Sequence, residues 1–151
     1  KFQHNRHLHH YFQPRLQAGL RYWEGRIDRC SLIASSRSVR RRRGFQPIAD
    51  VAHYLGDALK IPVSLDISKR RNQHQSHQNF KERFWQMHNA LEPGRNSRSL
   101  AGQRVLIVED VYTTGSTANE AARVLTRLGA SRVDVLSLVY RPSNLDEVVV
   151  A

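Results

Sequence analysis

The sequence predicts an α/β fold, in which a mainly parallel, twisted sheet is flanked by helices. Short apolar segments alternate along the chain with segments whose apolar residues recur at helical spacing. One apolar run, residues 105–108, is uninterrupted, which is typical of a parallel strand buried on both faces. A chain of 151 residues with 40% hydrophobic residues suits one such domain, and we expect residues 1–151 to form it.

Residues 1–23 carry a helical apolar stripe and several histidines. The stripe consists of Leu8, Tyr11, Phe12, Leu16 and Leu20. Pro14 predicts a break, or the start of a helix, in the middle of this stripe, because proline lacks the amide hydrogen that a helix interior needs. The histidines are His4, His7, His9 and His10. No carboxylate or cysteine accompanies them, so an exposed or nucleic-acid-facing helix is favoured over a metal site.

The first predicted strand covers residues 30–34 and runs into a polar loop. In open α/β sheets ligands bind beyond the carboxyl ends of the strands, so this loop is a candidate ligand site. Its residues are Ser35, Ser36, Arg37 and Ser38, and the run Arg40, Arg41, Arg42 and Arg43 follows. Such a run is commonly a solvated surface. Because this run adjoins the candidate ligand loop, contact with phosphate or nucleic acid is as strongly favoured as a purely solvated surface.

The middle of the chain predicts a helix, a strand and a long polar excursion. Residues 48–59 have helical spacing, and Pro47 suits the first turn of that helix. Residues 61–67 alternate between apolar and polar in the manner of a strand. Residues 68–81 are too polar to form a core element. We expect this excursion to be either a lid or simple disorder.

A strand, a polar loop and a helix follow one another from residue 105. The carboxylates of Glu109 and Asp110 come directly after the strand, and burying such groups is costly unless they bind something. The loop consists of Thr113, Thr114, Gly115, Ser116 and Thr117. The helical spacing that follows stops at Gly129. Because free backbone N–H groups and the helix dipole point into such a loop, it predicts a phosphate site, with the carboxylates placed for sugar hydroxyls or a metal.

Three further stretches predict less regular structure. A short returning helix is predicted from Phe84, Met87, Ala90 and Leu91. Residues 92–101 are predicted to be a connector, because proline, glycine and serine gather there. Residues 133–140 predict another apolar strand, and residues 148–150, beyond the break at Pro142, predict an added edge strand.

Charge is the unusual feature of the composition. The chain has 24 Lys and Arg against 13 Asp and Glu, for a net charge of +11. The excess lies in residues 1–100, which attract polyanions such as nucleic acid, or smaller phosphorylated ligands. Basicity that serves only solubility is the alternative.

Several classes of protein are disfavoured by composition. No apolar run approaches the ~20 residues needed to span a membrane. The single cysteine, Cys30, excludes an internal disulfide, and we expect a cytoplasmic protein. The chain starts at Lys1 without a signal-peptide pattern, as a piece of a longer protein would. No Gly-x-x-x-x-Gly-Lys-Ser/Thr sequence is present, so a nucleoside-triphosphatase loop is not supported.

Residues 105–117 resemble the phosphoribosyl pyrophosphate (PRPP) motif of type I phosphoribosyltransferases. The wider pattern, from Lys1 to Arg141, is similar to the ComF subfamily, which is associated with DNA uptake and natural competence. Residues 43–46, Arg-Gly-Phe-Gln, resemble the Arg-Gly-Phe-Asn-Gln signature of that subfamily, and Gln75, Arg83 and Ala90 fall at its spaced positions. The resemblance implies a type I phosphoribosyltransferase fold with a flexible hood loop.

The resemblance also implies a role for each part of the site. Glu109 and Asp110 would be the catalytic carboxylates that hold the ribose 2′- and 3′-hydroxyls. The loop from Thr113 to Thr117 would cradle the 5-phosphate, and the loop from Ser35 to Arg37 would lie at the pyrophosphate. Residues 68–81 would be the hood. Mg²⁺ would bind with PRPP rather than directly to the protein. The zinc-binding N-terminal segment common in this subfamily, with its paired cysteines, is absent from this chain.

Two classes of function follow from these expectations. One is transfer of a phosphoribosyl group from PRPP to an acceptor, assisted by Mg²⁺. The other is a non-catalytic module that binds single-stranded DNA through basic and polar side chains. The candidates for that contact are Arg40, Arg41, Arg42, Arg43, Lys69, Arg70, Arg71, Gln75 and Arg83. A homo-oligomer or a partner from the competence machinery is also expected. A glutamine amidotransferase is rejected, because Cys30 lies in an apolar strand rather than near an N-terminus.

Overall fold

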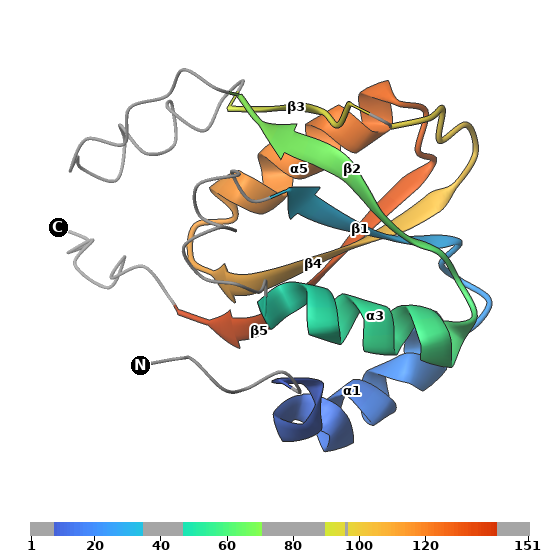
Figure 1. The fold of residues 1–151 in the computed structure, drawn as a ribbon, viewed down its shortest axis with the longest axis vertical. Helices are drawn as coiled ribbons and strands as arrows, with labels where there is room; N and C mark the ends of the chain where they lie inside the picture. Colours follow the sequence, from blue (N-terminus) through green and yellow to red (C-terminus); the bar gives the residue numbers. More distant parts are fainter. Residues whose placement is uncertain (1–7, 35–46, 71–89, 96, 142–151) are drawn as a thin grey trace, which may run out of the picture.

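The computed structural model describes residues 8–34, 47–70, 90–95 and 97–141, which form a five-stranded sheet with helices on both faces (Figure 1). The helices are α1 (Leu8–Trp23), α3 (Pro47–Leu59) and α5 (Ser116–Arg127). The strands are β1 (Arg29–Ala34), β2 (Val63–Lys69), β3 (Leu91–Pro93), β4 (Arg104–Tyr112) and β5 (Arg132–Tyr140). The α/β fold class predicted from the alternation of apolar segments is confirmed.

The strand order is β3-β2-β1-β4-β5, and β3 alone among the described strands runs antiparallel to its neighbour. Between β1 and β2 the chain forms α3, and between β4 and β5 it forms α5. The two connections leave the centre of the sheet in opposite directions, one from β1 and one from β4. The order of the strands therefore reverses between β1 and β4, which in α/β sheets marks the crevice where ligands bind.

Strand β4 lies between two hydrophobic cores because its side chains alternate across the sheet. Leu106 and Val108 belong to the core beneath α1 and α3, whereas Val105 and Ile107 belong to the core beneath α5. Figure 1 shows the same arrangement, with α1 and α3 on one face of the sheet and α5 on the other. All four side chains are at most 2% exposed. The prediction that residues 105–108 form a strand buried on both faces is confirmed.

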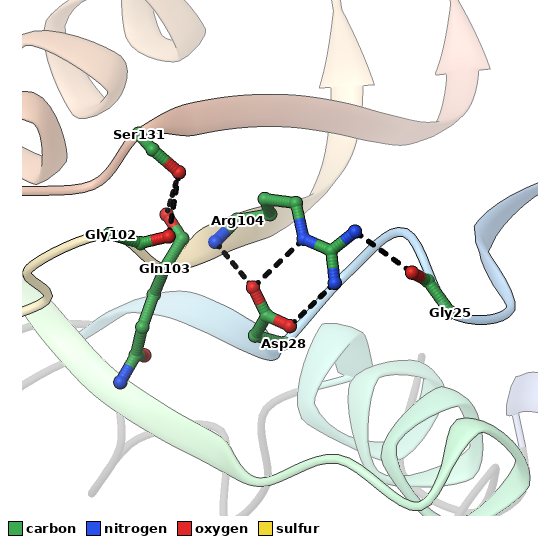
Figure 2. Close-up of polar contacts among 6 residues, drawn as sticks. All are labelled: Gly25, Asp28, Gly102, Gln103, Arg104 and Ser131. Atoms are coloured by element: carbon green, nitrogen blue, oxygen red, sulfur yellow. Dashed lines mark hydrogen bonds and ion pairs between the residues drawn. The ribbon is translucent and has the colours of Figure 1, made fainter.

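A polar cluster fixes the amino end of β4 to the loop before β1 (Figure 2). The Asp28 carboxylate accepts hydrogen bonds from Arg104 through its backbone N at 2.8 Å, Nε at 3.0 Å and Nη2 at 2.7 Å. Arg104 Nη1 also donates to the Gly25 carbonyl at 2.8 Å. The hydrogen bonds from Arg104 lower the pKa of Asp28 to about 2. The Ser131 hydroxyl donates to the Gly102 carbonyl at 2.8 Å, which ties the start of β5 to the same end of the sheet.

Helix α1 is continuous from residue 8 to residue 23, so the break predicted at Pro14 is wrong. Pro14 is exposed, and the apolar side chains Phe12, Leu16 and Leu20 on both sides of it pack against one core. This shared packing outweighs the local cost of proline within a helix.

The polar excursion begins later than the predicted residue 68. Ser68 and Lys69 belong to β2, because Ser68 is paired with Ala34 on one side and with Glu92 on the other. Leu91–Pro93 forms β3. The helix predicted to include Leu91 is therefore wrong at that residue, and the connector predicted for residues 92–101 is wrong at its start. The edge strand predicted at residues 148–150 lies outside the described residues.

The end of α5 agrees with the predicted stop at Gly129. Gly129 has φ 102°, and its N–H donates to the Thr126 carbonyl at 2.9 Å. No helix in the described part of the chain is both long enough and apolar enough to cross a membrane.

Candidate functional site

The candidate site lies at the carboxyl ends of β1 and β4, at the point where the strand order reverses. The two strands are parallel, and Ser31 is paired with Ile107. Ala34, the last residue of β1, lies three residues after Ser31, and Asp110 of β4 lies three residues after Ile107. Strand β4 itself continues to Tyr112, so Glu109 and Asp110 lie inside the strand rather than after it. Strand β1 therefore ends at the edge of the sheet where the loop after β4 begins, and residues 35–37, which follow β1 in the sequence, lie outside the described residues.

The carboxylates of Glu109 and Asp110 have opposite surroundings. The Glu109 side chain follows Val105 and Ile107 onto the α5 face and is buried, with 8% of the residue exposed. Its Oε1 has no hydrogen-bond partner among the described residues. Burial, and next the negative charge of Asp110, raise the pKa of Glu109 to about 7. Asp110 is exposed, and its Oδ1 accepts a hydrogen bond of 2.9 Å from the Val111 backbone N.

The loop that follows β4 covers residues 113–115 and leads directly into α5, so Ser116 and Thr117, predicted in the loop, form the first turn of the helix instead. Gly115 is the residue before the helix and has φ 73°, a conformation that favours glycine. The hydroxyls of Thr114 and Ser116 share a hydrogen bond of 2.6 Å, and Thr114 Oγ1 accepts from the Ser116 backbone N at 3.2 Å. Gly115 supplies no side-chain cap to the helix. The amino end of α5 and a group of hydroxyls thus face the same loop, an arrangement suited to a phosphate.

A residue that the sequence interpretation missed, Tyr112, lies against this loop. A Cβ atom built on Gly115 would lie 2.8 Å from Tyr112 Cζ and still closer to its hydroxyl oxygen. The Tyr112 ring also contacts the Tyr140 ring, with centroids 6.2 Å apart. The signal available in the sequence was an aromatic residue at the end of the strand, three positions before a glycine that the loop requires.

The structure brings together seven of the predicted site residues: Glu109, Asp110, Thr113, Thr114, Gly115, Ser116 and Thr117. Lys69 ends β2 and is exposed. Arg70 follows it, and its Nε lies 3.5 Å from Glu92 Oε2 in an exposed ion pair. The other predicted residues lie outside the described part of the chain. They are Ser35, Ser36, Arg37, Arg40, Arg41, Arg42, Arg43, Arg71, Gln75 and Arg83.

The described side chains fit a ligand that brings its own hydroxyls and phosphates. No group of three or more His, Cys, Asp or Glu side chains that could hold a metal ion occurs among the described residues. Glu109 Oε1 is a buried acceptor without a donor among the residues that the structure describes, and the neighbouring residue Asp110 has an exposed carboxylate. These oxygens can accept hydrogen bonds from vicinal hydroxyls. A divalent ion fits such a site when the ligand's own oxygens complete its coordination.

Comparisons with known proteins agree with this geometry. The profile of the family described as phosphoribosyl transferase domain matches residues 41–149, well over half of the chain. Two solved structures share the fold. A hypoxanthine phosphoribosyltransferase from Staphylococcus aureus has a TM-score of 0.55 at 12% identity, covering 94% of this chain and 69% of that one. An adenine phosphoribosyltransferase from Saccharomyces cerevisiae has a TM-score of 0.54 at 17% identity, covering 86% and 69%.

The chain therefore belongs to the phosphoribosyl transferase domain family, and its fold is that of a type I phosphoribosyltransferase. Within that family it is ComF-like. Competence protein F of Haemophilus influenzae is 31% identical over 99 residues, which cover 64% of this chain and 43% of that protein. An adenine phosphoribosyltransferase of Anaeromyxobacter sp. is 46% identical over 56 residues, covering 33% of this chain and 32% of that enzyme. The chain thus matches less than half the length of these curated relatives.

Proposed function

We propose that the chain binds PRPP with Mg²⁺ and transfers the phosphoribosyl group to an acceptor. The observation that carries this proposal is the order of groups on one segment: a buried carboxylate whose Oε1 has no donor among the described residues, an exposed carboxylate, and a hydroxyl loop at the amino end of α5. This order matches that of a ribose 5-phosphate, whose hydroxyls and phosphate stand at opposite ends of one sugar. The family match and the similarity to adenine and orotate phosphoribosyltransferases support it.

Each residue has a distinct role in this proposal. Asp110 and Glu109 accept hydrogen bonds from the 2′- and 3′-hydroxyls of the ribose. The hydroxyls of Thr113, Thr114, Ser116 and Thr117 and the first N–H groups of α5 hold the 5-phosphate. Ser35, Ser36 and Arg37, which follow β1 in the sequence, are assigned to the pyrophosphate from the resemblance of the sequence to type I phosphoribosyltransferases. Mg²⁺, when bound through the oxygens of PRPP, offsets the charge of the leaving pyrophosphate.

The reaction consists of one exchange at the anomeric carbon. The bond from that carbon to the pyrophosphate oxygen breaks, a bond to the acceptor forms, and the acceptor gives up its proton. Positive charge develops on the sugar during this exchange, and the carboxylates of Glu109 and Asp110 lie on the strand that holds its hydroxyls. The protein thus contributes position and electrostatic stabilisation rather than a nucleophile of its own.

Thermal unfolding with and without PRPP tests the proposal. In the presence of Mg²⁺, PRPP should raise the melting temperature of the wild-type protein, because a ligand that binds only the folded state stabilises it. Asp110→Ala should lose this increase. An increase of the same size in the variant would exclude the assigned site.

A second proposal, contact with single-stranded DNA during DNA uptake, is favoured by the net charge of +11 and by the similarity to competence protein F. Fluorescence anisotropy with a labelled oligonucleotide tests it. Binding should weaken steeply as salt is raised, because cations released from the DNA accompany each phosphate contact. Binding that does not respond to salt, or no binding, would remove the proposal.

A further inference from the structure

Tyr112 occupies the space that a side chain at position 115 would need. The loop turns back over the end of β4, so Gly115 lies on the phenol three residues earlier in the chain. A Cβ atom on Gly115 would lie 2.8 Å from Cζ and 3.4 Å from Cε2, and closer still to the hydroxyl oxygen. Contacts this short are essentially never seen for Cβ atoms, so a side chain at position 115 would require the Tyr112 ring or the loop to shift. Both the contact with the ring and the left-handed conformation, with φ 73°, therefore favour glycine at position 115.

The Tyr112 ring is itself held by β5 rather than by the loop alone. Tyr112 and Tyr140 are paired in the parallel register of β4 and β5. Their ring centroids lie 6.2 Å apart at an angle of 38°. The Tyr112 carbonyl accepts a hydrogen bond of 2.9 Å from the Arg141 backbone N. Contacts with Tyr140 of β5 and with Arg141, the residue that follows this strand, thus fix Tyr112, and the sheet sets the position of the loop.

We propose that Tyr112 is a positioning residue for the 5-phosphate, an inference that rests on the proposed function. Its ring supports Gly115 and thereby sets the position of the loop and of the first turn of α5 for the phosphate. A loop that is ordered before the ligand arrives loses less conformational entropy on binding. The ring acts by contact, and the phenol hydroxyl is not a ligand of the phosphate.

Calorimetric titrations of the full chain with two probes test this role. Ribose 5-phosphate reports on the 113–117 loop, whereas pyrophosphate with Mg²⁺ reports on the other end of the site. Tyr112→Ala should weaken the binding of ribose 5-phosphate by about tenfold. It should leave the binding of pyrophosphate unchanged, which a general loss of structure would not do. Tyr112→Phe keeps the ring and should bind ribose 5-phosphate within about twofold of the wild type.

The control is Tyr22→Ala, which removes a half-exposed tyrosine of α1 and should leave the binding of both probes unchanged. Should Tyr112→Ala fail to fold, Tyr112→Leu keeps an apolar residue in β4 while emptying the space beneath Gly115, and the same tenfold loss is expected.

Wild-type affinity for ribose 5-phosphate in a folded Tyr112→Ala or Tyr112→Leu protein would overturn the inference alone. Tyr112→Phe as weak as Tyr112→Ala would also overturn it, because the hydroxyl would then contact the phosphate directly. A wild-type protein that binds neither probe would overturn the proposed function, and this inference with it.

Discussion

Glu109 and Asp110 are neighbours on β4, yet one carboxylate is buried against the α5 face while the other is exposed to solvent. The difference follows from the alternation of side chains in a strand that continues past both residues. As a consequence, two acidic residues of similar chemistry lie in different electrostatic environments, one desolvated and one in contact with water. Glu109 has a raised pKa, and its Oε1 has no hydrogen-bond donor among the described residues. Stability and ligand binding should both depend on this pair.

Glu109 should make the protein less stable at neutral and alkaline pH than at mildly acidic pH. Its pKa is about 7 in the folded state, above the ordinary value of 4.5, so the folded state binds more protons than the unfolded state between these values. Stability therefore falls as the pH rises from about 4.5 to about 7, by at most about 3 kcal/mol. Glu109→Gln should remove this dependence and be more stable than the wild type at about pH 8.

Urea unfolding of the wild type and of Glu109→Gln at several pH values measures this difference. Glu24→Gln, a change at an exposed residue of the loop after α1, serves as the control and should follow the wild type. Identical pH profiles for the wild type and Glu109→Gln would mean that Glu109 is not desolvated.

Asp28 should stabilise the protein at neutral pH and lose this contribution in acid, which is the reverse of the pH dependence expected for Glu109. Its pKa is lowered from 3.8 to about 2, so its contribution is complete above about pH 3.8 and is lost as the pH falls through about 2. The pair with Arg104 is more than one third exposed, and after allowance for screening by solvent Asp28→Asn should cost about 1 kcal/mol at neutral pH. Chemical denaturation gives the value, with Asp57→Asn as an exposed control. A cost that persists unchanged below the pKa of Asp28 would contradict this account.

Gly129 should tolerate alanine less well than Gly25, although both have positive φ. The φ values are 102° and 66°, and a Cβ atom on Gly129 would lie 3.1 Å from the Ala101 backbone, whereas one on Gly25 would meet nothing within 4 Å. Gly25→Ala should cost about 1 kcal/mol from its conformation alone. Gly129→Ala should cost about 2–3 kcal/mol, because the contact with Ala101 adds to the strain. Equal melting temperatures for the two variants would show that the contact relaxes freely.

Much of the site could be predicted because it occupies one continuous segment. The apolar run, the two acids, the hydroxyl loop and the helix follow in order from Val105, and each part has a local signal. The split between Glu109 and Asp110 had no such signal. It depends on the pairing of β4 with β5 as far as Tyr112 and Tyr140, which extends the strand beyond both acids. The contact of Tyr112 with Gly115 depends on the same extension.

The errors in the predicted fold arose where tertiary contacts outweigh local preference. Strand β3 has three residues, one of them a proline, and no alternation that could reveal it. It forms because Gly94 and Arg70 donate backbone hydrogen bonds to the carbonyls of Asp66 and Ala90, at 2.8 and 2.9 Å. Gly94 is also required there, since a Cβ atom would collide with the Leu65 carbonyl. These contacts join residues that are distant in the sequence, so no local pattern could predict them.

The most direct test of the central claim is a calorimetric titration of the protein with PRPP in the presence of Mg²⁺. We expect saturable binding at one site per chain. Asp110→Asn should weaken it by about tenfold to a hundredfold, because a hydrogen bond to a charged group contributes about 1.5–3 kcal/mol. Glu24→Gln, which removes a carboxylate elsewhere on the surface, should bind as the wild type does. No binding to the wild type, or equal affinity in Asp110→Asn, would contradict the assignment of this site to PRPP.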